Sequence, residues 1–563
     1  YDQTCASEKR RRRKKNTAEK THFPDPARRV VINELVCEGC GDCNLQSNCL
    51  SVEPLETEFG RKRKINQSSC NKDYSCLKGF CPSFVTVEGG QLKKGKSAGG
   101  SIPTLPQPTV PSLRSQGAYG IVITGVGGTG VVTIGQLLGM AAHLEGKGLS
   151  VLDMAGLAQK GGAVFSHVQI TPTPDDLYAT RIAMGEADVV IGGDLIVTAS
   201  NEALSKIKSG VTKAVVNTAE SPTADFVRNP NWQFGSPNLA TQIREAVGDR
   251  ECAFVDANAL ATALMGDAIY TNPMMLGFAW QRGWIPLAYQ TLQRAIEINA
   301  VAVDNNKKAF EWGRAAAHDV EMVKRIAFPD NVVELRRVSN SLDEIVAKRV
   351  DFLTGYQNAN YAKRYANLVE RVRKVESDRL QSTGVTEAVA RYYFKLLAYK
   401  DEYEVGRLHS DPAFRAKIAA QFDGDYKLNF YMAPPIISKP DPVTGKVAKK
   451  RFGPWMMSAF SVLAGLKFLR GSALDVFGYT AERRTERALI GEYEATVEEI
   501  LSRLSADNQD VAVQLASVPE DIRGYGHIKE GNLKVARIKW DDLLARLRGQ
   551  VKAQVIKISP KAA

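Results

Sequence analysis

Eight of the nine cysteines lie within the first 81 residues, and three of them, Cys37, Cys40 and Cys43, follow a C-x2-C-x2-C spacing. Thiolates at this spacing can bind three corners of a cubane iron–sulfur cluster. In two-cluster modules the fourth ligand comes from a distant cysteine that is often followed by proline. Cys81 precedes Pro82. The spacing therefore predicts a [4Fe-4S] cluster on these four cysteines.

Three more cysteines of the same segment, Cys49, Cys70 and Cys76, are expected to bind a second [4Fe-4S] cluster. A complete set needs an eighth thiolate, and Cys5 is the nearest candidate. If Cys5 lies elsewhere, the second centre would hold three irons or use a ligand other than cysteine. Structural zinc is the alternative for both groups, although zinc usually binds cysteines in pairs.

A glycine-rich loop lies between an apolar run at 120–124 and a predicted helix at 131–144. A G-x-G-x-x-G segment in this context is typical of dinucleotide-binding domains, in which the glycines approach a pyrophosphate. Asp153, at the end of the next predicted strand, would then bind the ribose. Tight packing between strand and helix explains the same glycines equally well. The candidate cofactor-binding glycines are Gly125, Gly127, Gly128 and Gly130.

A second glycine-rich loop follows Asp153 and contains Gln159 and Lys160. Ligands bind at the carboxyl ends of strands in α/β sheets, so these two residues are further candidates for cofactor binding. His167 follows on an alternating strand, a position more typical of a structural histidine than of a catalytic one. The spacing identifies no catalytic residue.

The segments that must position these residues differ in composition. From residue 118, short apolar runs alternate with helical stretches, which predicts an α/β domain with a mainly parallel sheet. After about residue 330, apolar residues recur at helical spacing. We therefore expect a multidomain α/β and α protein with a ferredoxin-like two-cluster module. The predicted division is a basic segment at 1–30, an iron–sulfur module at 31–87, a Gly- and Pro-rich linker at 88–117, an α/β domain at 118–328, a mostly helical domain at 329–545 and a tail at 546–563.

Composition limits the function classes. Hydrophobic residues make up 44% of the chain and charged residues 24%, which is ordinary for a globular protein. No apolar run is long enough for a membrane span and no secretory signal is visible, so we expect a cytoplasmic protein without a membrane partner. Cys252 stands alone in an apolar stretch and is expected to be a buried hydrophobic residue.

The net charge of +12 includes two basic runs, Lys9–Lys15 and Arg61–Lys64. Neither run has the interleaved aromatic residues or groove-reading motif of a nucleic-acid site, so no nucleic acid is expected. Two interpretations of the second run remain: a solvated loop, or an exposed positive rim that steers an acidic redox carrier such as ferredoxin.

Taken together, these residues resemble the bacterial indolepyruvate:ferredoxin oxidoreductases in their fused form, which are members of the thiamine-dependent 2-oxoacid:ferredoxin oxidoreductase family. The resemblance extends over nearly the whole chain. It includes the two cysteine segments, both glycine loops and several further strings. These strings are Tyr1–Cys5, Gln67–Cys70, Gly79–Pro82, Ser166–Val168, Asn272–Gly277, Ala433–Pro435, Phe452–Trp455 and Gly478–Arg484.

The resemblance implies that a 2-oxoacid such as indolepyruvate is decarboxylated on thiamine diphosphate and magnesium, that coenzyme A accepts the acyl group, and that two [4Fe-4S] clusters pass electrons to ferredoxin. No G-D-G…N segment for the diphosphate is visible, and the chain begins at Tyr1 rather than Met. This chain would therefore carry the electron-transfer and gamma parts. Residues 1–30 would be the segment that follows a missing thiamine-binding half.

The resemblance also implies the partners: the thiamine-binding half of the same enzyme, ferredoxin, the 2-oxoacid, coenzyme A and further copies of the chain in a homo-oligomer. Two other function classes remain open. One is an iron–sulfur reductase whose Rossmann domain binds NAD(P) or FAD. The other is a non-catalytic scaffold with structural zinc.

Overall fold

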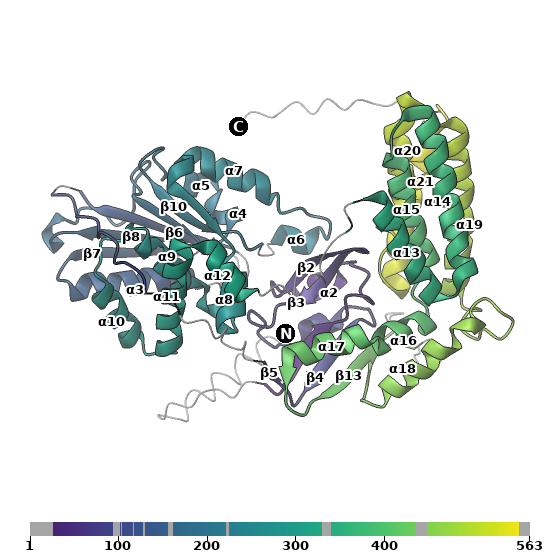
Figure 1. Ribbon diagram of the computed structural model, residues 1–563, viewed down its shortest axis with the longest axis horizontal. Helices are drawn as coiled ribbons and strands as arrows, with labels where there is room; N and C mark the ends of the chain where they lie inside the picture. The colour runs from purple at the N-terminus through teal and green to yellow at the C-terminus, as the bar shows by residue number, and fades with distance from the viewer. Residues whose placement is uncertain are drawn as a thin grey trace.

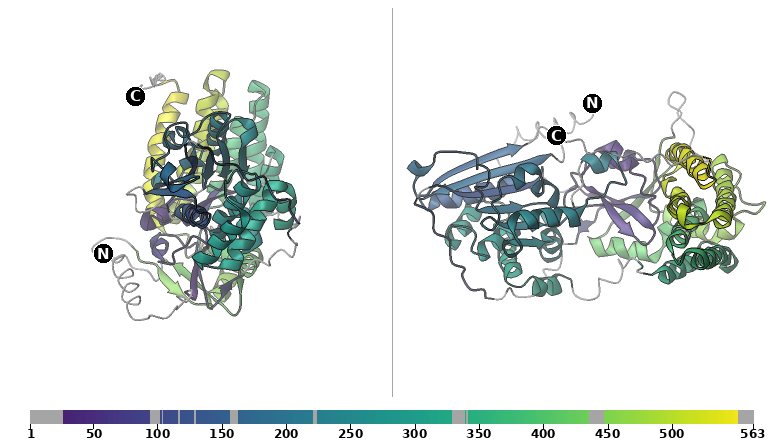
Figure 2. Two further views of the ribbon diagram at one scale, coloured as in Figure 1. Left: turned by 90° about the vertical axis from the view of Figure 1, so that its left-hand side faces the viewer. Right: turned by 90° about the horizontal axis from the view of Figure 1, so that it is seen from above.

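The computed structural model describes residues 26–93, 102, 104–115, 117–127, 130–155, 162–220, 224–328, 339, 341–434 and 447–550. Four of the predicted site residues, Cys5, Gly128, Gln159 and Lys160, lie outside these ranges, as does the basic run Lys9–Lys15. Figures 1 and 2 show the cysteine-rich module between an α/β domain and a bundle of long helices. The expected fold class, a mixed α/β and helical protein, is confirmed.

The cysteine-rich module is built on short strands and one short helix. Its elements are β1 (Arg28–Ile32), α2 (Asp42–Ser47), the hairpin β2 (Val52–Thr57) and β3 (Gly60–Ile65), the 3-10 turn η1 (Ser75–Lys78), β4 (Phe84–Glu88) and β5 (Gln91–Leu92). β1 and β4 pair antiparallel, with Ile32 opposite Phe84. This pairing brings together the loops that carry the cysteines, because one loop follows β1 and the other precedes β4.

The sheet of the module is completed by a distant part of the chain. β13 (Lys427–Met432) pairs with β4, and β14 (Lys450–Phe452) pairs with β13, which gives the strand order β1-β4-β13-β14. A second short pair joins β5 to β12 (Phe422–Asp423). The strands β12 to β14 were not predicted: the segment 329–545 was expected to be mostly helical. The predicted boundaries themselves stay a prediction.

The α/β domain contains a six-stranded sheet of order β11-β10-β9-β6-β8-β7. Its strands are β6 (Tyr119–Val126), β7 (Gly148–Ala155), β8 (Ala163–Thr171), β9 (Val189–Gly192), β10 (Lys213–Asn217) and β11 (Cys252–Val255). Only β8 runs against the other strands, because it is antiparallel to both β6 and β7 while the remaining neighbours are parallel. The prediction of a mainly parallel sheet is confirmed.

Helices cover both faces of this sheet, because side chains alternate along each strand. Ile121 and Ile123 of β6 face a core formed with one group of helices, whereas Val122 faces the other group. The first group is α3 (Val131–Leu144), α8 (Ala257–Met265), α9 (Thr271–Gln281), α10 (Tyr289–Asn299), α11 (Val303–His318) and α12 (Val320–Ala327). The second is α4 (Leu195–Thr198), α5 (Asn201–Leu204) and α7 (Ser236–Val247), whereas α6 (Ala224–Arg228) contacts α2 of the module.

The C-terminal region has two parts. A bundle with its own core contains α13 (Leu342–Tyr356), α14 (Ala359–Leu380), α15 (Gly384–Leu397), α19 (Ala481–Arg503), α20 (Gln509–Ser517) and α21 (Gly526–Leu547). The other part contains α16 (Glu402–Ser410), α17 (Pro412–Gln421) and α18 (Met456–Gly465). α17 and α18 pack on the four-stranded sheet, where Phe414 and Phe460 share a core with Val85 and Val87.

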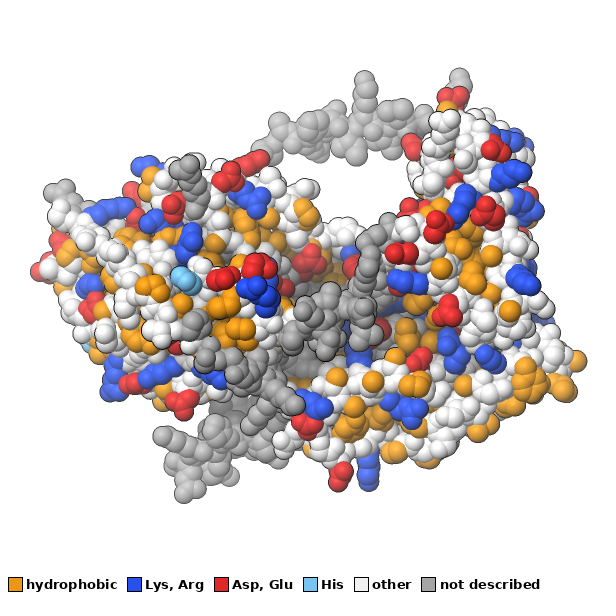
Figure 3. Space-filling model, viewed as in Figure 1, with side chains coloured by type: hydrophobic (Ala, Val, Ile, Leu, Met, Phe, Trp, Pro, Cys, Tyr) orange, Lys and Arg blue, Asp and Glu red, His pale blue; other side chains and the backbone are white. Residues whose placement is uncertain are grey.

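Hydrophobic side chains gather on the surface over α18 and the residues after it (Figure 3). Trp455, Val462, Phe468, Leu474 and Val476 are each more than 60% exposed in this segment, at 63%, 63%, 69%, 71% and 65%. Exposed apolar surface of this kind is common at protein–protein contacts. Among the described helices, none combines the length and the apolar character that crossing a membrane requires.

Candidate functional site

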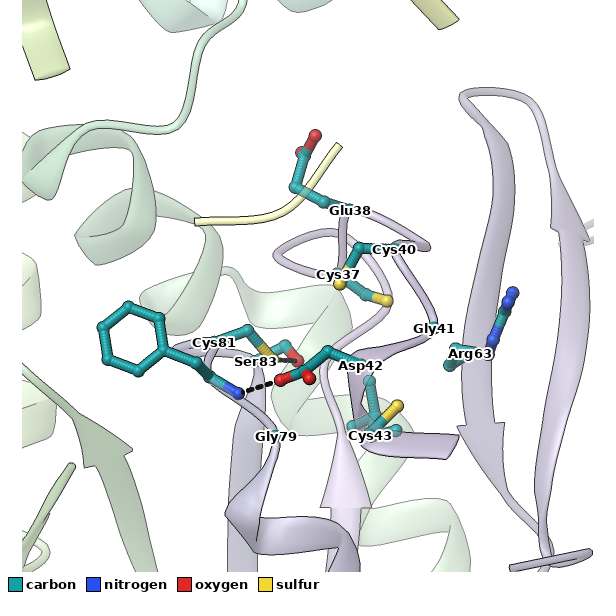
Figure 4. Close-up of a pocket in the computed structure, with 12 residues that line it drawn as sticks. Cys37, Glu38, Cys40, Gly41, Asp42, Cys43, Arg63, Gly79, Cys81 and Ser83 are labelled. Carbon is teal, nitrogen blue, oxygen red and sulfur yellow. Dashed lines mark hydrogen bonds between the residues drawn. The ribbon is translucent and has the colours of Figure 1, made fainter. Parts of the chain in front are cut away.

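Four cysteines line one pocket at the centre of the molecule (Figure 4). Cys37 and Cys40 lie in the loop after β1, Cys43 lies in α2, and Cys81 follows η1. Cys37 and Cys43 are buried, while Cys40 and Cys81 are partly buried. These are the four residues that the spacing assigns to one cluster, and the fold brings them together from two segments.

Glycines allow the loop to wrap around this pocket. Gly39 and Gly41 have φ of 68° and 80°, in the left-handed region that other residues avoid. A Cβ atom on Gly39 would lie 2.2 Å from the carbonyl oxygen of Arg61, and one on Gly79 would lie 2.9 Å from Cα of Cys43. The backbone N–H of Gly39 donates to Sγ of Cys37 at 3.3 Å.

Asp42 joins the two cysteine segments. Its carboxylate accepts a hydrogen bond of 2.6 Å from the backbone N–H of Phe80, the residue before Cys81 (Figure 4). The neighbouring Glu38 side chain points away from the sulfur atoms, towards the helical bundle (Figure 4). The loop therefore presents thiols on one side and a carboxylate on the other.

The electrostatics of the pocket favour a cationic occupant. Burial, together with the nearby Cys81 thiol, raises the pKa of Cys40 to about 12. Burial also raises the pKa of Cys43 well above its ordinary value, and Cys81, Cys40 and Cys37 add to this shift. Four thiolates can coexist here only if positive charge compensates them, as coordinated metal does. The donor set of four cysteines fits a [4Fe-4S] cluster.

Arg63 places one positive charge beside the pocket. It lies on β3, is 1% exposed, and donates to Oδ1 of Asn44 at 3.1 Å and to the carbonyl oxygen of Pro230 at 3.3 Å. Its guanidinium also lies 4.7 Å from the ring centroid of Phe226 in the α/β domain. Arg63 thus connects the cysteine loop to the α/β domain.

A second group of thiols lies in the same module. Burial raises the pKa of Cys76 to about 12, and the neighbouring thiols of Cys70 and Cys49 contribute. The structure therefore brings together the three cysteines predicted for the second cluster, whereas Cys5 lies outside the described residues. No group of three or more His, Cys, Asp or Glu within the described ranges is arranged to hold a single metal ion.

The glycine loop of the α/β domain is filled by protein contacts. The N–H of Gly127 donates to the carbonyl oxygen of Gly162 at 2.7 Å, and the N–H of Val126 donates to Oδ2 of Asp194 at 2.7 Å. A Cβ atom on Gly130 would lie 2.4 Å from Nδ2 of Asn272. Two N–H groups that could cradle a pyrophosphate are thus already bonded, and the described glycines are used in packing.

Asp153 does not lie beside this loop. It is on β7, opposite Ser166 of β8, and β8 separates β7 from β6. In a Rossmann domain the strand with the ribose-binding acid is the direct neighbour of the strand before the glycine loop. His167 on β8 is fully buried, and its Nδ1 accepts from the N–H of Ile182 at 3.3 Å, which fits a structural role.

The prediction of an exposed positive rim at Arg61–Lys64 is wrong. Lys62 and Arg63 are buried, Lys64 pairs with Glu53, and Arg61 donates to the carbonyl oxygen of Trp232 at 2.7 Å. The run lies on β3, which is enclosed between the cysteine loop and neighbouring parts of the chain. The charges of Lys62 and Arg63 therefore act inside the molecule, whereas the side chain of Lys64 is partly exposed.

Sequence reasoning missed three residues of the C-terminal region that contact the cysteine segments. Nζ of Lys400 donates to the carbonyl oxygen of Cys37 at 3.2 Å, and the hydroxyl of Tyr525 donates to that of Val36 at 2.5 Å. Nζ of Lys449 donates to the carbonyl oxygens of Gly79 and, at 3.4 Å, of Cys81. These residues follow the cysteines by more than 350 positions in the chain, and no local motif marks them.

Comparisons with known proteins agree with this architecture. The family described as pyruvate ferredoxin/flavodoxin oxidoreductase matches residues 120–316, so the α/β domain is of an oxidoreductase class. A family of unknown function (DUF6537) matches residues 342–542. The chain is 32% identical over 208 residues to indolepyruvate oxidoreductase subunit IorB of Pyrococcus horikoshii, which covers 36% of this chain and 97% of the relative.

The corresponding subunit of Thermococcus kodakarensis is 32% identical over 213 residues, with 36% of this chain and 97% of the relative covered. The chain belongs to the 2-oxoacid:ferredoxin oxidoreductase family and is an oxidoreductase. The predicted family is thereby confirmed, while the fused bacterial form stays a prediction.

Two solved structures also match part of this chain. Pyruvate oxidoreductase subunit PORC of Thermotoga maritima is 21% identical, with a TM-score of 0.27 and coverage of 35% of this chain and 96% of its own. The gamma subunit of a keto/oxoacid ferredoxin oxidoreductase from Geobacter sulfurreducens is 20% identical, with a TM-score of 0.26. The match covers 36% of this chain and 98% of that subunit.

Proposed function

We propose that this chain is the electron-transfer and gamma part of a thiamine-dependent, cytoplasmic 2-oxoacid:ferredoxin oxidoreductase that acts on indolepyruvate or another arylpyruvate. The observation that carries the proposal is the pocket lined by Cys37, Cys40, Cys43 and Cys81, in a chain whose α/β domain is related to IorB subunits. The products are an acyl-coenzyme A and reduced ferredoxin.

The chain's own residues would hold and insulate the redox groups. A [4Fe-4S] cluster on the four pocket cysteines would supply transfer of single electrons. Gly39 donates its N–H to the sulfur of Cys37, Asp42 fixes the segment of Cys81, and Arg63 holds a positive charge next to the thiolates. Cys49, Cys70 and Cys76, completed by Cys5, would hold the second [4Fe-4S] cluster.

The carbon chemistry belongs to the partner. Thiamine diphosphate and magnesium in the thiamine-binding half would stabilise the carbanion formed on decarboxylation. The edge of the α/β domain with Gly125, Gly127, Gly128 and Gly130 would face that half. Gln159 and Lys160 would lie beside it, with Lys160 offering a positive charge to coenzyme A or to the substrate carboxylate. A homo-oligomer of the complete enzyme is part of the proposal.

Anaerobic assays test this function. The purified chain alone should not reduce ferredoxin with indolepyruvate and coenzyme A, and adding the thiamine-binding half should restore reduction. The same preparation should contain iron and acid-labile sulfide. Protein without iron, or a restored activity that persists when Cys43 and Cys81 are both replaced by serine, would overturn the proposal.

The Rossmann alternative makes an opposite prediction, because it requires nucleotide binding by this chain. Calorimetric titration with NADH, NADPH and FAD should show no micromolar binding, since Asp194 and Gly162 already bond the loop N–H groups. Micromolar binding that is lost in the Asp153→Ala variant would favour the reductase instead.

A further inference from the structure

The C-terminal region forms a cap over the cysteine loop. Lys400 follows α15, donates to the carbonyl oxygens of Val36 and Cys37 at 3.4 and 3.2 Å, and forms an ion pair with Glu38. Tyr525 precedes α21 and donates to the carbonyl oxygen of Val36. At Gly524 even an added Cβ atom would come within 3.4 Å of Cβ of Cys40. Residues that flank helices within the DUF6537 match therefore contact the loop that holds three cysteines.

Most cations of this cap have acidic partners. Glu38 is surrounded by Lys62, Lys395, Lys400 and Lys529, and although burial alone would raise the pKa of Glu38, these lysines hold it below the ordinary value. Lys529 also forms an ion pair with Glu486. The charges in this interface are thus partly compensated by neighbouring carboxylates.

Lys449 differs from these lysines. Its ammonium donates to the carbonyl oxygens of Gly79 and Cys81 and lies 4.5 Å from the ring centroid of Phe84. These partners are neutral, so they orient the ammonium without cancelling its charge. Burial lowers the pKa of Lys449, whereas Cys81, Cys43, Cys76 and Asp42 favour its protonated form.

Lys449 therefore lies against the segment that joins the two groups of cysteines, because its Nζ donates to the carbonyl oxygens of Gly79 and Cys81. Cys81 belongs to the first group, and Cys76, at the other end of this segment, belongs to the second. Arg63, which is also held by neutral oxygens, interacts with Cys37, Cys43 and Cys40. Two buried cations thus act on the first group, one from the module and one from the C-terminal region.

We propose that Lys449 is a positioning residue of the C-terminal region that raises the reduction potential of the centre held by Cys37, Cys40, Cys43 and Cys81. The inference rests on the proposed iron–sulfur function. One-electron reduction adds one negative charge to such a centre, and a buried ammonium stabilises the more negative state more strongly. The region matched by a family of unknown function would thus cover the redox module and supply a positive charge to it.

Lys449→Gln is the most informative variant, because an amide can still donate to the two carbonyl oxygens but carries no charge. We expect its first centre to have a more negative midpoint potential, by at least about 59 mV, which is a tenfold change in a one-electron equilibrium constant. Lys449→Arg should stay close to the unaltered protein. Lys539→Met is the matched control, since Lys539 pairs with Asp521 on the exposed side of the bundle.

The measurement is a potentiometric titration of the anaerobically purified full chain, monitored by electron paramagnetic resonance. The signal that disappears in Cys43→Ser identifies the first centre. An unchanged potential in Lys449→Gln with full iron content overturns the inference, and so does loss of iron in both Lys449→Gln and Lys449→Arg, which would make Lys449 structural. Absence of iron and of any signal in the unaltered protein would instead overturn the proposed function.

Discussion

Each buried thiol of the module makes its neighbours harder to ionise. Burial is the largest cause of the raised pKa values of Cys40, Cys43 and Cys76; thiols of their own group add to the shifts of Cys40 and Cys43, and Cys70 and Cys49 add to that of Cys76. The seven described cysteines of the module thus form two electrostatic groups. If each group holds one cluster, single replacements should affect one centre at a time.

Cys43→Ser is expected to lose one cluster and Cys76→Ser the other. With four irons in each cubane, iron should fall from about eight to about four per chain in either variant. Iron and sulfide analysis measures this, and the spectroscopic signals lost in the two variants should differ. Cys252→Ser is the control, because Cys252 lies on β11 of the α/β domain. Loss of the same signal from both variants would contradict the assignment to two groups.

The residue scale also shows how far spacing predicts a site. Four cysteines that share a pocket were predictable from the C-x2-C-x2-C spacing and the Cys81-Pro82 pair, because both motifs are local and chemically specific. The same reasoning wrongly placed Arg61–Lys64 in an exposed rim, since the sequence of a run of charged residues is the same whether the run lies on a surface or inside an interface. Lys449 was missed because its contacts depend on tertiary pairing with a strand of the module.

At the scale of elements, one buried arginine attaches the hairpin of the module to the bundle. Arg349 of α13 is 2% exposed and donates to Oε1 of Glu58 at 2.6 Å and to the carbonyl oxygen of Glu58 at 2.8 Å. Its guanidinium also contacts the rings of Phe59 and Phe394. The turn between β2 and β3 is thereby held against the helices.

Arg349→Met should release this turn and cost on the order of 3 kcal/mol, because it removes the buried cation that pairs with the Glu58 carboxylate. Thermal unfolding should begin at a lower temperature, and hydrogen exchange should increase at Thr57–Gly60. In the control, Arg371→Met removes a half-exposed pair with Glu498 and should cost about 1 kcal/mol or less. Equal effects of the two variants would contradict a special role for Arg349.

The same contact predicts a pH dependence. Burial would raise the pKa of Glu58, but hydrogen bonds from Ser339 and Arg349 lower it to about 2 from an ordinary 4.5. A carboxyl with a lowered folded pKa stabilises the fold above its unfolded pKa and loses this contribution as pH falls towards the folded value. Hydrogen exchange of the hairpin should therefore increase between pH 4.5 and pH 2, and less so in Arg349→Met.

Two glycines allow α9 and α11 of the α/β domain to cross closely. A Cβ atom on Gly313 would lie 1.9 Å from the carbonyl oxygen of Met274, and one on Gly277 would lie 2.0 Å from that of Phe310. Both contacts are with backbone, so the helices themselves would have to separate. Neither glycine could be assigned this role from the sequence, because their contacts depend on how two helices dock.

Gly313→Ala is expected to destabilise the α/β domain by about 1–3 kcal/mol through overpacking. Gly491 is the matched control: it lies in α19 with open space around its Cα, so Gly491→Ala should stabilise the bundle by about 0.5–1 kcal/mol. Thermal unfolding of both variants measures whether each substitution lowers or raises stability. A stabilising Gly313→Ala would mean that the helices can move apart without loss of packing.

At the scale of the whole molecule, the α/β domain and the module differ in how much they depend on the rest of the chain. A stretch of 208 residues of this chain covers 97% of a relative, and the sheet of the α/β domain uses only its own strands. Its alternating strands and helices were predictable because they are local patterns. The module instead needs β13, which acquires strand structure through pairing with β4, and β14, which pairs with β13.

The last prediction follows from this difference. Residues 118–328 expressed alone should fold with native-like circular dichroism and a cooperative thermal transition. Residues 1–93 alone should incorporate much less iron, because the edge of β4 is left unpaired, Val85 and Val87 lose the cover of Phe414 and Phe460, and Lys449 and Tyr525 no longer hold the cysteine segments. Co-expression with residues 341–550 should restore iron content. An isolated module that retains full iron and native stability would show instead that the C-terminal region is dispensable for the redox site, and its contacts with the loop would then need another explanation.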